Sequence, residues 1–249
     1  MSEIINNTVA IVLSGGKGKR MGSDVPKQYL EVCGKPLLYY TLKTFEDSFV
    51  EKIVLVCGSE DEDYCKNQII DKYGFTKVCA VAFGGKERYH SVRNGLKCIR
   101  ERLCTNPDND RNMIVFIHDG ARPLIDEDTL RRCYEDTVRF GSGVAAVPSK
   151  DTVKIADEDG FALSTPARNS VYLMQTPQTF SFDDIYSAYE KLIEKEDELK
   201  NTGVIITDDA MVMESFTDKK VKLSMGNYRN IKITTPEDLN FMESVLNYF

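Results

Sequence analysis

The stretch "VAIVLSGGKGKRMGSDVPKQYL", Val9 to Leu30, runs from an apolar, strand-like segment directly into glycines and cations. The glycines and cations that follow the apolar segment are Gly15, Gly16, Gly18, Lys17, Lys19, Arg20 and Lys27. Backbone amides without side chains can cradle phosphate oxygens, and the cations would complement such a ligand. A solvated glycine turn is the alternative interpretation. The stretch therefore predicts a buried strand that ends in either an anion-binding loop or a plain turn.

Further apolar runs follow the same rhythm along the chain. The runs "TVAIVL", "KIVLVC", "KVCAVAF", "MIVFIH" and "GVAAVP" alternate with helical patterns such as "ERYHSVRNGLKCIRERL". This alternation predicts an α/β fold, with a mostly parallel sheet covered by helices. Ligands of open α/β sheets bind at the carboxyl ends of the strands, which is where the glycine loop would lie.

Composition narrows the class of protein. With 249 residues and 42% hydrophobic content, the chain can bury the core of one domain over residues 1–249. The formal charge of −7 argues against nucleic acid or an anionic membrane as the main partner. No apolar run reaches the length of a membrane span. The seven cysteines are odd in number and never spaced as C-x-x-C, so we expect reduced thiols and a cytoplasmic location.

Two segments depart from the sheet-and-helix alternation. A hairpin is predicted around "DEDG", Asp157 to Gly160, within an arm at about 149–170. A lone hairpin is marginal in water, so a second subunit is the simplest surface for this one to pack on. The tail "KVKLSMGNYRNIKITTPEDLNFMESVLNYF" predicts two short strands and a C-terminal helix that begins near Thr235.

The glycine loop does not match the common nucleotide codes. A Walker A loop needs G-x-x-x-x-G-K-[ST], which the stretch lacks, and the dinucleotide fingerprint G-x-G-x-x-G fails because Met21 stands at its third glycine. Lysine supplies a compact charge, whereas arginine can contact two oxygens at once. The mixture of Lys27 and Arg20 therefore suits a triphosphate that is bound and cleaved.

Two more loops carry candidate site residues. "FGGKERYHSVRNGL" places Gly84 and Gly85 before a helix whose first turns hold Ser91, an arrangement that could read the edge of a base. "FIHDGARP" places Asp119 at the end of a strand. A carboxylate beside a phosphate loop suits Mg²⁺, while a helix cap is the alternative role for Asp119. His118 is typical of a packed, hydrogen-bonded histidine.

Seven motifs then occur in the order found in a known family. They are "SGGKGKRMGSDVPKQYL", "GGKERYHSVRNGL", "HDGARP", "KDTVKI", "QTPQTF", "ITDDA" and "NIKITTPEDL". On these motifs the chain resembles the 2-C-methyl-D-erythritol 4-phosphate cytidylyltransferases over nearly its whole length. The resemblance implies a Rossmann-like nucleotidyltransferase domain that converts CTP and a polyol phosphate, methylerythritol phosphate, into CDP-methylerythritol and pyrophosphate with Mg²⁺. It also implies a homodimer whose protruding β-hairpin arm completes the partner's active site.

The resemblance assigns roles residue by residue. Arg20, Lys27 and Lys232 match cations that act on the triphosphate, and Asp119 matches the metal position. The positions assigned to the nucleotide are Ser14, Gly15, Gly16, Gly18, Gly85, Lys86, Ser91 and Gly120. The positions assigned to the sugar phosphate are Thr152, Arg168 and Thr176, the first two on the arm.

The chain also departs from the family pattern. Ser14 and Gly15 stand where alanines are frequent, and His90 replaces a frequent aspartate before Ser91. The "SGG" sequence is closer to the related ribitol 5-phosphate cytidylyltransferases, which are the second candidate. A protein that binds CTP without turnover is the third.

Overall fold

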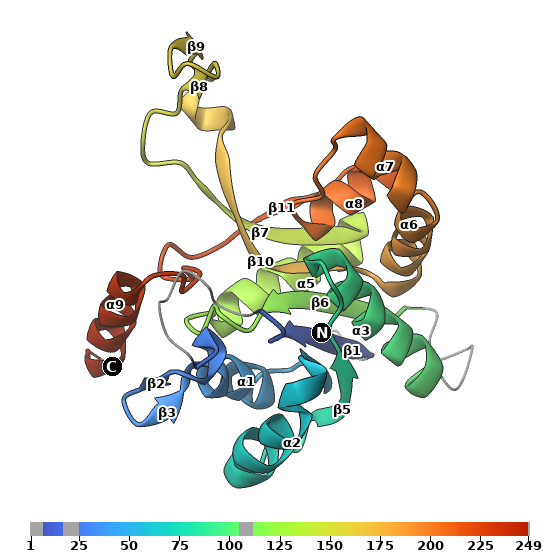
Figure 1. The fold of residues 1–249 in the computed structure, drawn as a ribbon, viewed down its shortest axis with the longest axis vertical. Helices are drawn as coiled ribbons and strands as arrows, with labels where there is room; N and C mark the ends of the chain where they lie inside the picture. Colours follow the sequence, from blue (N-terminus) through green and yellow to red (C-terminus); the bar gives the residue numbers. More distant parts are fainter. Residues whose placement is uncertain (1–6, 17–24, 105–111, 249) are drawn as a thin grey trace.

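The chain is built around one seven-stranded sheet with strand order β11-β7-β10-β6-β1-β4-β5. The computed structural model describes residues 7–16, 25–104 and 112–248. The strands of the sheet are β1 (Thr8–Leu13), β4 (Lys52–Cys57), β5 (Val78–Phe83), β6 (Ile114–Asp119), β7 (Ser142–Pro148), β10 (Tyr172–Ser181) and β11 (Leu223–Met225). Figure 1 shows the helices packed on both faces of this sheet.

The pairing of the strands confirms the predicted α/β class. Strand β1 pairs in parallel with β4 and β6, and β4 pairs in parallel with β5. Strand β10 is antiparallel to both β6 and β7, while β11 is parallel to β7. The sheet is therefore mostly parallel, with one antiparallel strand inserted. The carboxyl ends of β1 and β6 meet at the same edge, since Leu13 is in register with Asp119.

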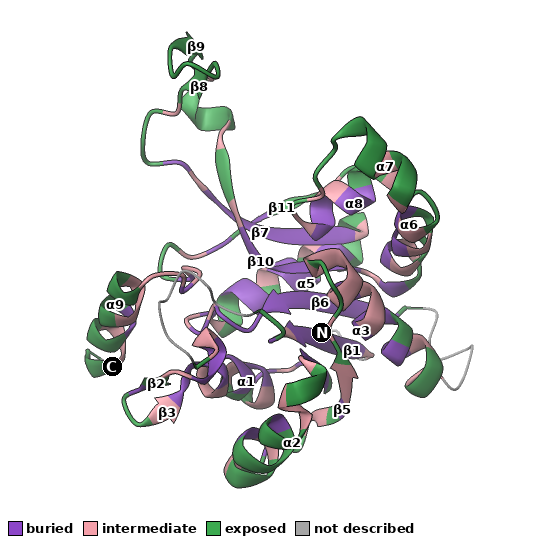
Figure 2. Cartoon of the chain, viewed as in Figure 1, coloured by how far each residue is buried: buried purple, intermediate pink, exposed green. Residues whose placement is uncertain are grey.

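Side-chain alternation along β1 divides the core into two layers. Val9 and Ile11 pack with α3 (Arg88–Arg102), α6 (Phe182–Glu194) and α8 (Asp209–Phe216). Ala10 and Val12 pack with the other layer, which is formed by α1 (Leu37–Asp47) and α5 (Glu127–Phe140). Successive residues of a strand point to opposite faces, so the continuous apolar run buries both. The sheet accordingly forms the buried centre in Figure 2.

The remaining elements are short or peripheral. They are η2 (Lys27–Tyr29), β2 (Glu31–Val32), β3 (Lys35–Pro36), η3 (Ser59–Asp61), α2 (Glu62–Tyr64), η4 (Cys65–Asp71), β8 (Ile155–Ala156), β9 (Ala162–Ser164), η5 (Arg168–Ser170), α7 (Glu196–Thr202) and α9 (Pro236–Asn247). Thr235 caps α9 through a capping box and Pro236 is its first residue, as the sequence predicts. Among the described residues, no helix combines the length and apolar character needed to cross a membrane.

One prediction for the tail is wrong. Strand β11 forms, but residues 230–234 make no second strand. Their backbone is bonded elsewhere: Ile233 N–H donates to the Ala121 carbonyl at 2.8 Å, and the Ile233 carbonyl accepts from Lys27 Nζ at 3.0 Å. Because loop and side-chain groups satisfy this backbone, the segment has no need of a neighbouring strand.

Strands β8 and β9 pair as a short antiparallel unit between β7 and β10. The turn between them contains Gly160 at φ +86°, a left-handed conformation that glycine adopts without strain. Figure 1 shows this segment (yellow) projecting away from the body of the molecule. Its role as a dimerisation arm over about 149–170 stays a prediction.

Candidate active site

A cavity of about 640 Å³ lies at the carboxyl edge of β1 and β6. The predicted site residues that line it are Ser14, Gly15, Gly16, Lys27, Gly85, Lys86, Ser91, Asp119 and Lys232. Segments far apart in the sequence thus converge at the edge where ligands of open α/β sheets bind. The predicted residues Gly18 and Arg20 lie outside the described residues.

The glycine loop begins where β1 leaves the sheet. Ser14 N–H still donates to the Val56 carbonyl at 2.6 Å, and the buried Gln28 side chain donates to the Ser14 carbonyl at 2.7 Å. Gly15 and Gly16 beyond this anchor are exposed. A Cβ atom added at Gly15 would come no closer than 3.8 Å to any neighbour, and one at Gly16 would have nothing within 4 Å. The open space above these glycines is therefore available to a ligand.

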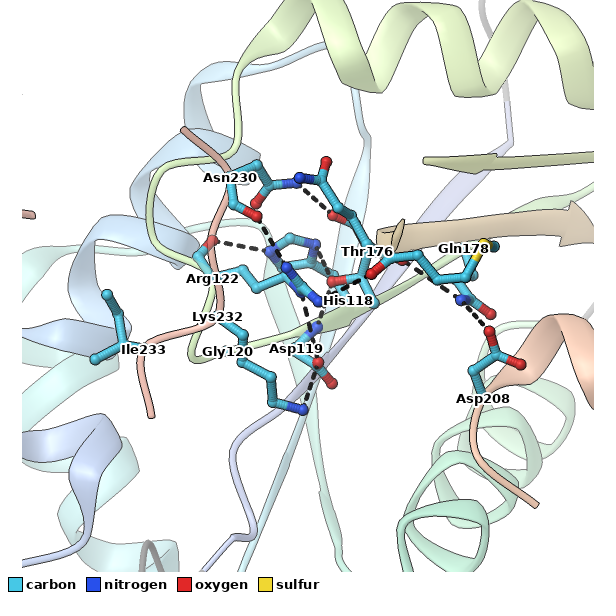
Figure 3. Close-up of polar contacts among 12 residues, drawn as sticks. His118, Asp119, Gly120, Arg122, Thr176, Gln178, Asp208, Asn230, Lys232 and Ile233 are labelled. Carbon is cyan, nitrogen blue, oxygen red and sulfur yellow. Dashed lines mark hydrogen bonds and ion pairs between the residues drawn. The ribbon is translucent and has the colours of Figure 1, made fainter. Parts of the chain in front are cut away.

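Asp119 is a carboxylate of the cavity that lies among cationic side chains, and Figure 3 shows its contact with Lys232. Its Oδ2 atom lies 2.8 Å from Lys232 Nζ and 3.7 Å from Arg122 Nε, while Oδ1 lies 3.5 Å from Arg88 Nε. Burial alone would raise the pKa of Asp119, but the charges of Arg88, Lys232 and Arg122 outweigh it and hold the pKa well below its usual range. Asp119 is therefore an anion inside a cationic cluster, and it does not cap a helix because α5 is capped by Asp126.

A second layer of polar contacts fixes the backbone of Asp119. Its N–H donates to Thr176 Oγ1 at 3.1 Å, and Thr176 Oγ1 lies 3.0 Å from His118 Nδ1. His118 Nε2 lies 3.1 Å from the Arg122 carbonyl, which can only accept, so the proton of the neutral ring is on Nε2. His118 Nδ1 then accepts from the Thr176 hydroxyl. Burial lowers the pKa of His118 to about 4, which keeps the ring neutral, and the packed role predicted for it is confirmed.

The guanidinium of Arg88 is bound by the buried carboxylate of Asp209. Its Nη1 and Nη2 atoms contact the two carboxylate oxygens of Asp209 at 2.8 and 2.7 Å. Asp209 is fully buried and also accepts from the Tyr189 hydroxyl at 2.5 Å. A bidentate pair fixes the plane of a guanidinium, so Arg88 presents Nε to Asp119 in one orientation.

The remaining predicted residues differ in their relation to the cavity. Lys27 begins η2 directly after Pro26 and lines the cavity. Gly120 is buried: its N–H bonds the Leu13 carbonyl at 2.8 Å, and a Cβ there would lie only 2.8 Å from the same oxygen. Gly120 therefore allows β1 and β6 to approach. Thr176 is buried beneath Asp119 and does not line the described cavity.

The two arm residues are outside the cavity in this chain. Thr152 and Arg168 are exposed, and they contact each other, with Arg168 Nη2 donating to Thr152 Oγ1 at 3.3 Å. They come from the projecting segment between β7 and β10.

Sequence reasoning missed several residues that shape the site. Arg88, Arg122 and Asp209 belong to motifs quoted above but received no role there, and Gln28 directly follows Lys27. The signal that could have identified Arg88, Arg122 and Asp209 was their position inside those motifs. Within residues 7–16, 25–104 and 112–248, no three histidine, cysteine or acidic side chains gather to hold a metal by themselves.

A mostly parallel sheet with a cationic, glycine-bordered cavity at its carboxyl edge defines the class of α/β proteins that bind phosphorylated ligands. Comparison with known proteins narrows this class. The family model for IspD, 2-C-methyl-D-erythritol 4-phosphate cytidylyltransferase, matches residues 8–248. The chain therefore belongs to this family.

Individual relatives agree with the family model. The protein of that name from Lachnoclostridium phytofermentans is 46% identical over 242 residues, covering 97% of each chain. Its counterpart from Lachnospira eligens is 46% identical over 231 residues, covering 92% of this chain and 95% of the relative. The crystal structure of 4-diphosphocytidyl-2C-methyl-D-erythritol synthase from Anaerococcus prevotii superposes with a TM-score of 0.78 at 34% identity, covering 96% of this chain and 98% of that one.

Proposed function

We propose that this chain transfers a cytidylyl group from CTP to 2-C-methyl-D-erythritol 4-phosphate, giving CDP-methylerythritol and pyrophosphate. Family membership supports the reaction. The observation that carries the proposal is the convergence of the glycine loop, Lys27, Lys232 and Asp119 in one cavity. The names of the relatives favour methylerythritol phosphate over ribitol 5-phosphate as acceptor.

The reaction needs no protein nucleophile. An oxygen of the acceptor phosphate attacks the α-phosphorus of CTP, and a new phosphorus–oxygen bond forms. The bond from the α-phosphorus to the bridging oxygen breaks, and its electron pair leaves with pyrophosphate. Transfers of this kind are accelerated mainly by positioning and by electrostatic stabilisation of the charge that shifts in the transition state.

The residues of the cavity supply those two effects. Gly15 and Gly16 leave room for the triphosphate to approach the backbone, as the space above them indicates. Lys27 and Lys232 border the same cavity and offset the charge on the phosphate oxygens. Lys27 is held by the Ile233 carbonyl, so its ammonium group is anchored beside the ligand. We keep Arg20 in the same role on its sequence motif alone.

Mg²⁺ fits the donor set of this cavity. Asp119 offers carboxylate oxygens to it, and Mg²⁺ usually takes one or two carboxylates together with substrate phosphates and waters. A site with one such carboxylate would thus be completed by CTP. When bound, Mg²⁺ would neutralise part of the triphosphate charge. Lys232 Nζ lies 2.8 Å from Asp119 Oδ2 and lines the same cavity, so its charge would lie beside the phosphates of a bound triphosphate.

The two other parts of the substrates are assigned to different segments. The exposed residues Gly85 and Lys86 are assigned to the cytosine edge, and Ser91 Oγ accepts from Gly85 N–H at 3.0 Å. Thr152 and Arg168 would bind methylerythritol phosphate in the cavity of a second subunit, which makes the enzyme a homodimer with composite sites. All seven cysteines are free thiols, which supports a cytoplasmic location.

Pyrophosphate release tests the proposal. CTP, UTP and ATP should each be paired with methylerythritol phosphate, ribitol 5-phosphate and ribose 5-phosphate, with and without Mg²⁺. We expect release with CTP, methylerythritol phosphate and Mg²⁺, much less with UTP, and least with ATP. Comparable turnover with ATP would contradict the base assignment, and a preference for ribitol 5-phosphate would contradict the acceptor. Binding of CTP without any release of pyrophosphate would contradict the transfer reaction and would indicate a protein that only binds CTP.

A further inference from the structure

The loop assigned to the base is connected to helix α7 by the side chain of His90. His90 is the third residue of α3, and its Nδ1 atom accepts from Glu87 N–H at 3.2 Å. Its Nε2 atom lies 3.2 Å from Glu196 Oε2, on the first residue of α7. Since Nδ1 is an acceptor, the proton of the neutral ring is on Nε2 and is donated to Glu196. One imidazole thus bonds the loop on one side and α7 on the other.

His90 also contacts the loop directly, at Glu87 and at Gly85. The Glu87 side chain accepts from the His90 backbone N–H, which completes a reciprocal capping box at the start of α3. A Cβ atom added at Gly85 would lie only 2.3 Å from His90 Cβ, so the Gly85 backbone rests directly on this residue. A shift of His90 would therefore move Gly85 and Glu87 together.

Glu196 is itself held in place by several contacts. Its Oε1 atom accepts from the Tyr89 hydroxyl at 2.9 Å and lies 2.6 Å from Lys200 Nζ. The Tyr89 and His90 rings pack with their centroids 4.4 Å apart. Hydrogen bonds from Lys200 and then His90 lower the pKa of Glu196 to about 2, so this acceptor is ionised at neutral pH. Glu196 is therefore a fixed anion to which the start of α3 is attached twice.

We propose that Glu196 and His90 are positioning residues for nucleotide binding, with Glu196 orienting the imidazole that holds the Gly85–Glu87 backbone in its ligand-binding shape. Neither residue lines the cavity, so both act through the loop. The identity of the ligand rests on the proposed function. An aspartate at position 90 could accept from Glu87 N–H, but its negative charge would repel Glu196. The contact with α7 therefore depends on histidine at this position.

The matched control is another side-chain contact of helix α3, the ion pair of Arg93 with Glu190. Arg93 Nε contacts Glu190 Oε1 at 3.0 Å and joins α3 to α6 without touching the loop. Glu196→Ala removes the acceptor for His90, whereas Glu190→Ala removes an acceptor for Arg93. Glu196→Gln keeps an oxygen that can accept from His90 and serves as the conservative variant. A general loosening of α3 would affect Glu196→Ala and Glu190→Ala alike.

Hydrogen exchange in the ligand-free protein tests the positioning without any turnover. We expect faster exchange of the amides of residues 85–88 in Glu196→Ala, little change in Glu196→Gln, and parent-like exchange in Glu190→Ala. Equal exchange in Glu196→Ala and the parent would overturn the proposal. This result is independent of whether the protein turns over CTP, so failure of the proposed function would be seen separately.

Calorimetric CTP binding and steady-state kinetics test the consequence for the ligand. Loss of the hydrogen bonds from His90 and Tyr89 to Glu196 should raise the Kd for CTP about 3- to 10-fold in Glu196→Ala. We expect kcat at saturating CTP to stay within about twofold of the parent, because the reacting atoms are untouched. The double variant His90→Ala with Glu196→Ala should bind CTP more tightly than the sum of the two single losses predicts, since the two residues share the His90–Glu196 contact. A lowered kcat with unchanged CTP affinity would contradict the assignment, as would additive losses.

Discussion

The edge of the sheet around Asp119 and the segment at 149–170 differ in the contacts that each makes with the rest of the chain. Asp119 is buried and contacts Arg88, Arg122 and Lys232 within the chain. In the projecting segment, Phe161 is 72% exposed and Leu163 is 66% exposed, and β8 pairs only with β9 among the described strands. Figure 2 shows the same contrast, with a buried sheet below and an exposed arm above.

This contrast indicates which half of the site one chain can complete. The charges near Asp119 are ordered before any ligand arrives, so little reorganisation is needed at the moment of reaction. The arm exposes apolar side chains that are costly to leave in water, which points to a further surface covering them. We therefore expect the nucleotide half to be intrinsic to each chain and the acceptor half to depend on a neighbour.

The largest effect should come from Asp119→Asn, which would disrupt the charged cluster in the nucleotide half of the site. The substitution would remove the carboxylate proposed to hold Mg²⁺ and leave three cations facing an amide, so we expect kcat/KM to fall about 10³-fold, the scale of several kcal/mol of metal stabilisation. The Mg²⁺ concentration needed for half-maximal rate should rise. Asp183→Asn, at an exposed ion pair with Arg100, is the control. A Mg²⁺ titration that overlays the parent's would show that Asp119 has no metal role.

Lys27→Ala should have the next largest effect. If Lys27 stabilises charge in the transition state, kcat should fall about 10²-fold, as for one lost electrostatic donor. The exposed Lys43, which pairs with Asp47, supplies the control variant Lys43→Ala. Should only the KM for CTP rise while kcat is unchanged, Lys27 would be a binding residue and no more.

The burial of His118 beside Asp119 should also be visible in the pH dependence of the free energy of unfolding. The pKa of His118 is about 4 in the folded chain because of burial, against about 6.5 when unfolded. Between these values the unfolded chain binds more protons, so stability falls as the pH falls. We expect this group to remove about 2 kcal/mol of unfolding free energy between pH 7 and pH 5.

Urea unfolding at the two pH values measures this loss. His118→Asn should flatten the pH dependence, whatever its effect on absolute stability. An unchanged slope in His118→Asn would mean that burial does not hold this ring neutral.

The smallest effect on the single chain should come from the arm. Phe161→Ser combined with Leu163→Ser alters exposed residues, so the stability of the monomer should change by no more than about 0.5 kcal/mol. The same pair of substitutions should lower the mass seen by sedimentation from dimer toward monomer. A dimer that persists unchanged would show that the apolar arm residues do not form the interface.

The two regions also differ in how far the sequence predicts them. The apolar runs that become β1, β4, β5, β6 and β7 were readable because buried parallel strands need continuous apolar residues. The inserted β10 was not, because its antiparallel direction depends on partners on both sides. The pair of Arg88 and Asp209 spans 121 positions, and only the folded sheet shows that two motifs share one salt bridge.

The place of Asp119 in the cavity was predictable because the strand that it ends shares a carboxyl edge with the strand before the glycine loop. Its surroundings were less predictable, and its metal role stays a prediction. The sequence left a metal ligand and a helix cap as alternatives, and the cap at Asp126 resolves that choice against the second. The absence of a strand at residues 230–234 follows from bonds to Lys27 and Ala121, which no local pattern reveals.

Subunit mixing tests most directly whether one chain supplies the nucleotide half and its neighbour the acceptor half. Lys27→Ala and Arg168→Ala chains, each of low activity alone, are unfolded together and reassembled. In a mixed dimer with composite sites, one site collects both defects and the other collects none. With random pairing, half of the dimers are mixed, so we expect activity to recover to roughly a quarter of the parent level. No recovery, in a sample whose mass spectrum contains mixed dimers, would contradict the account, because every site would then keep one defect.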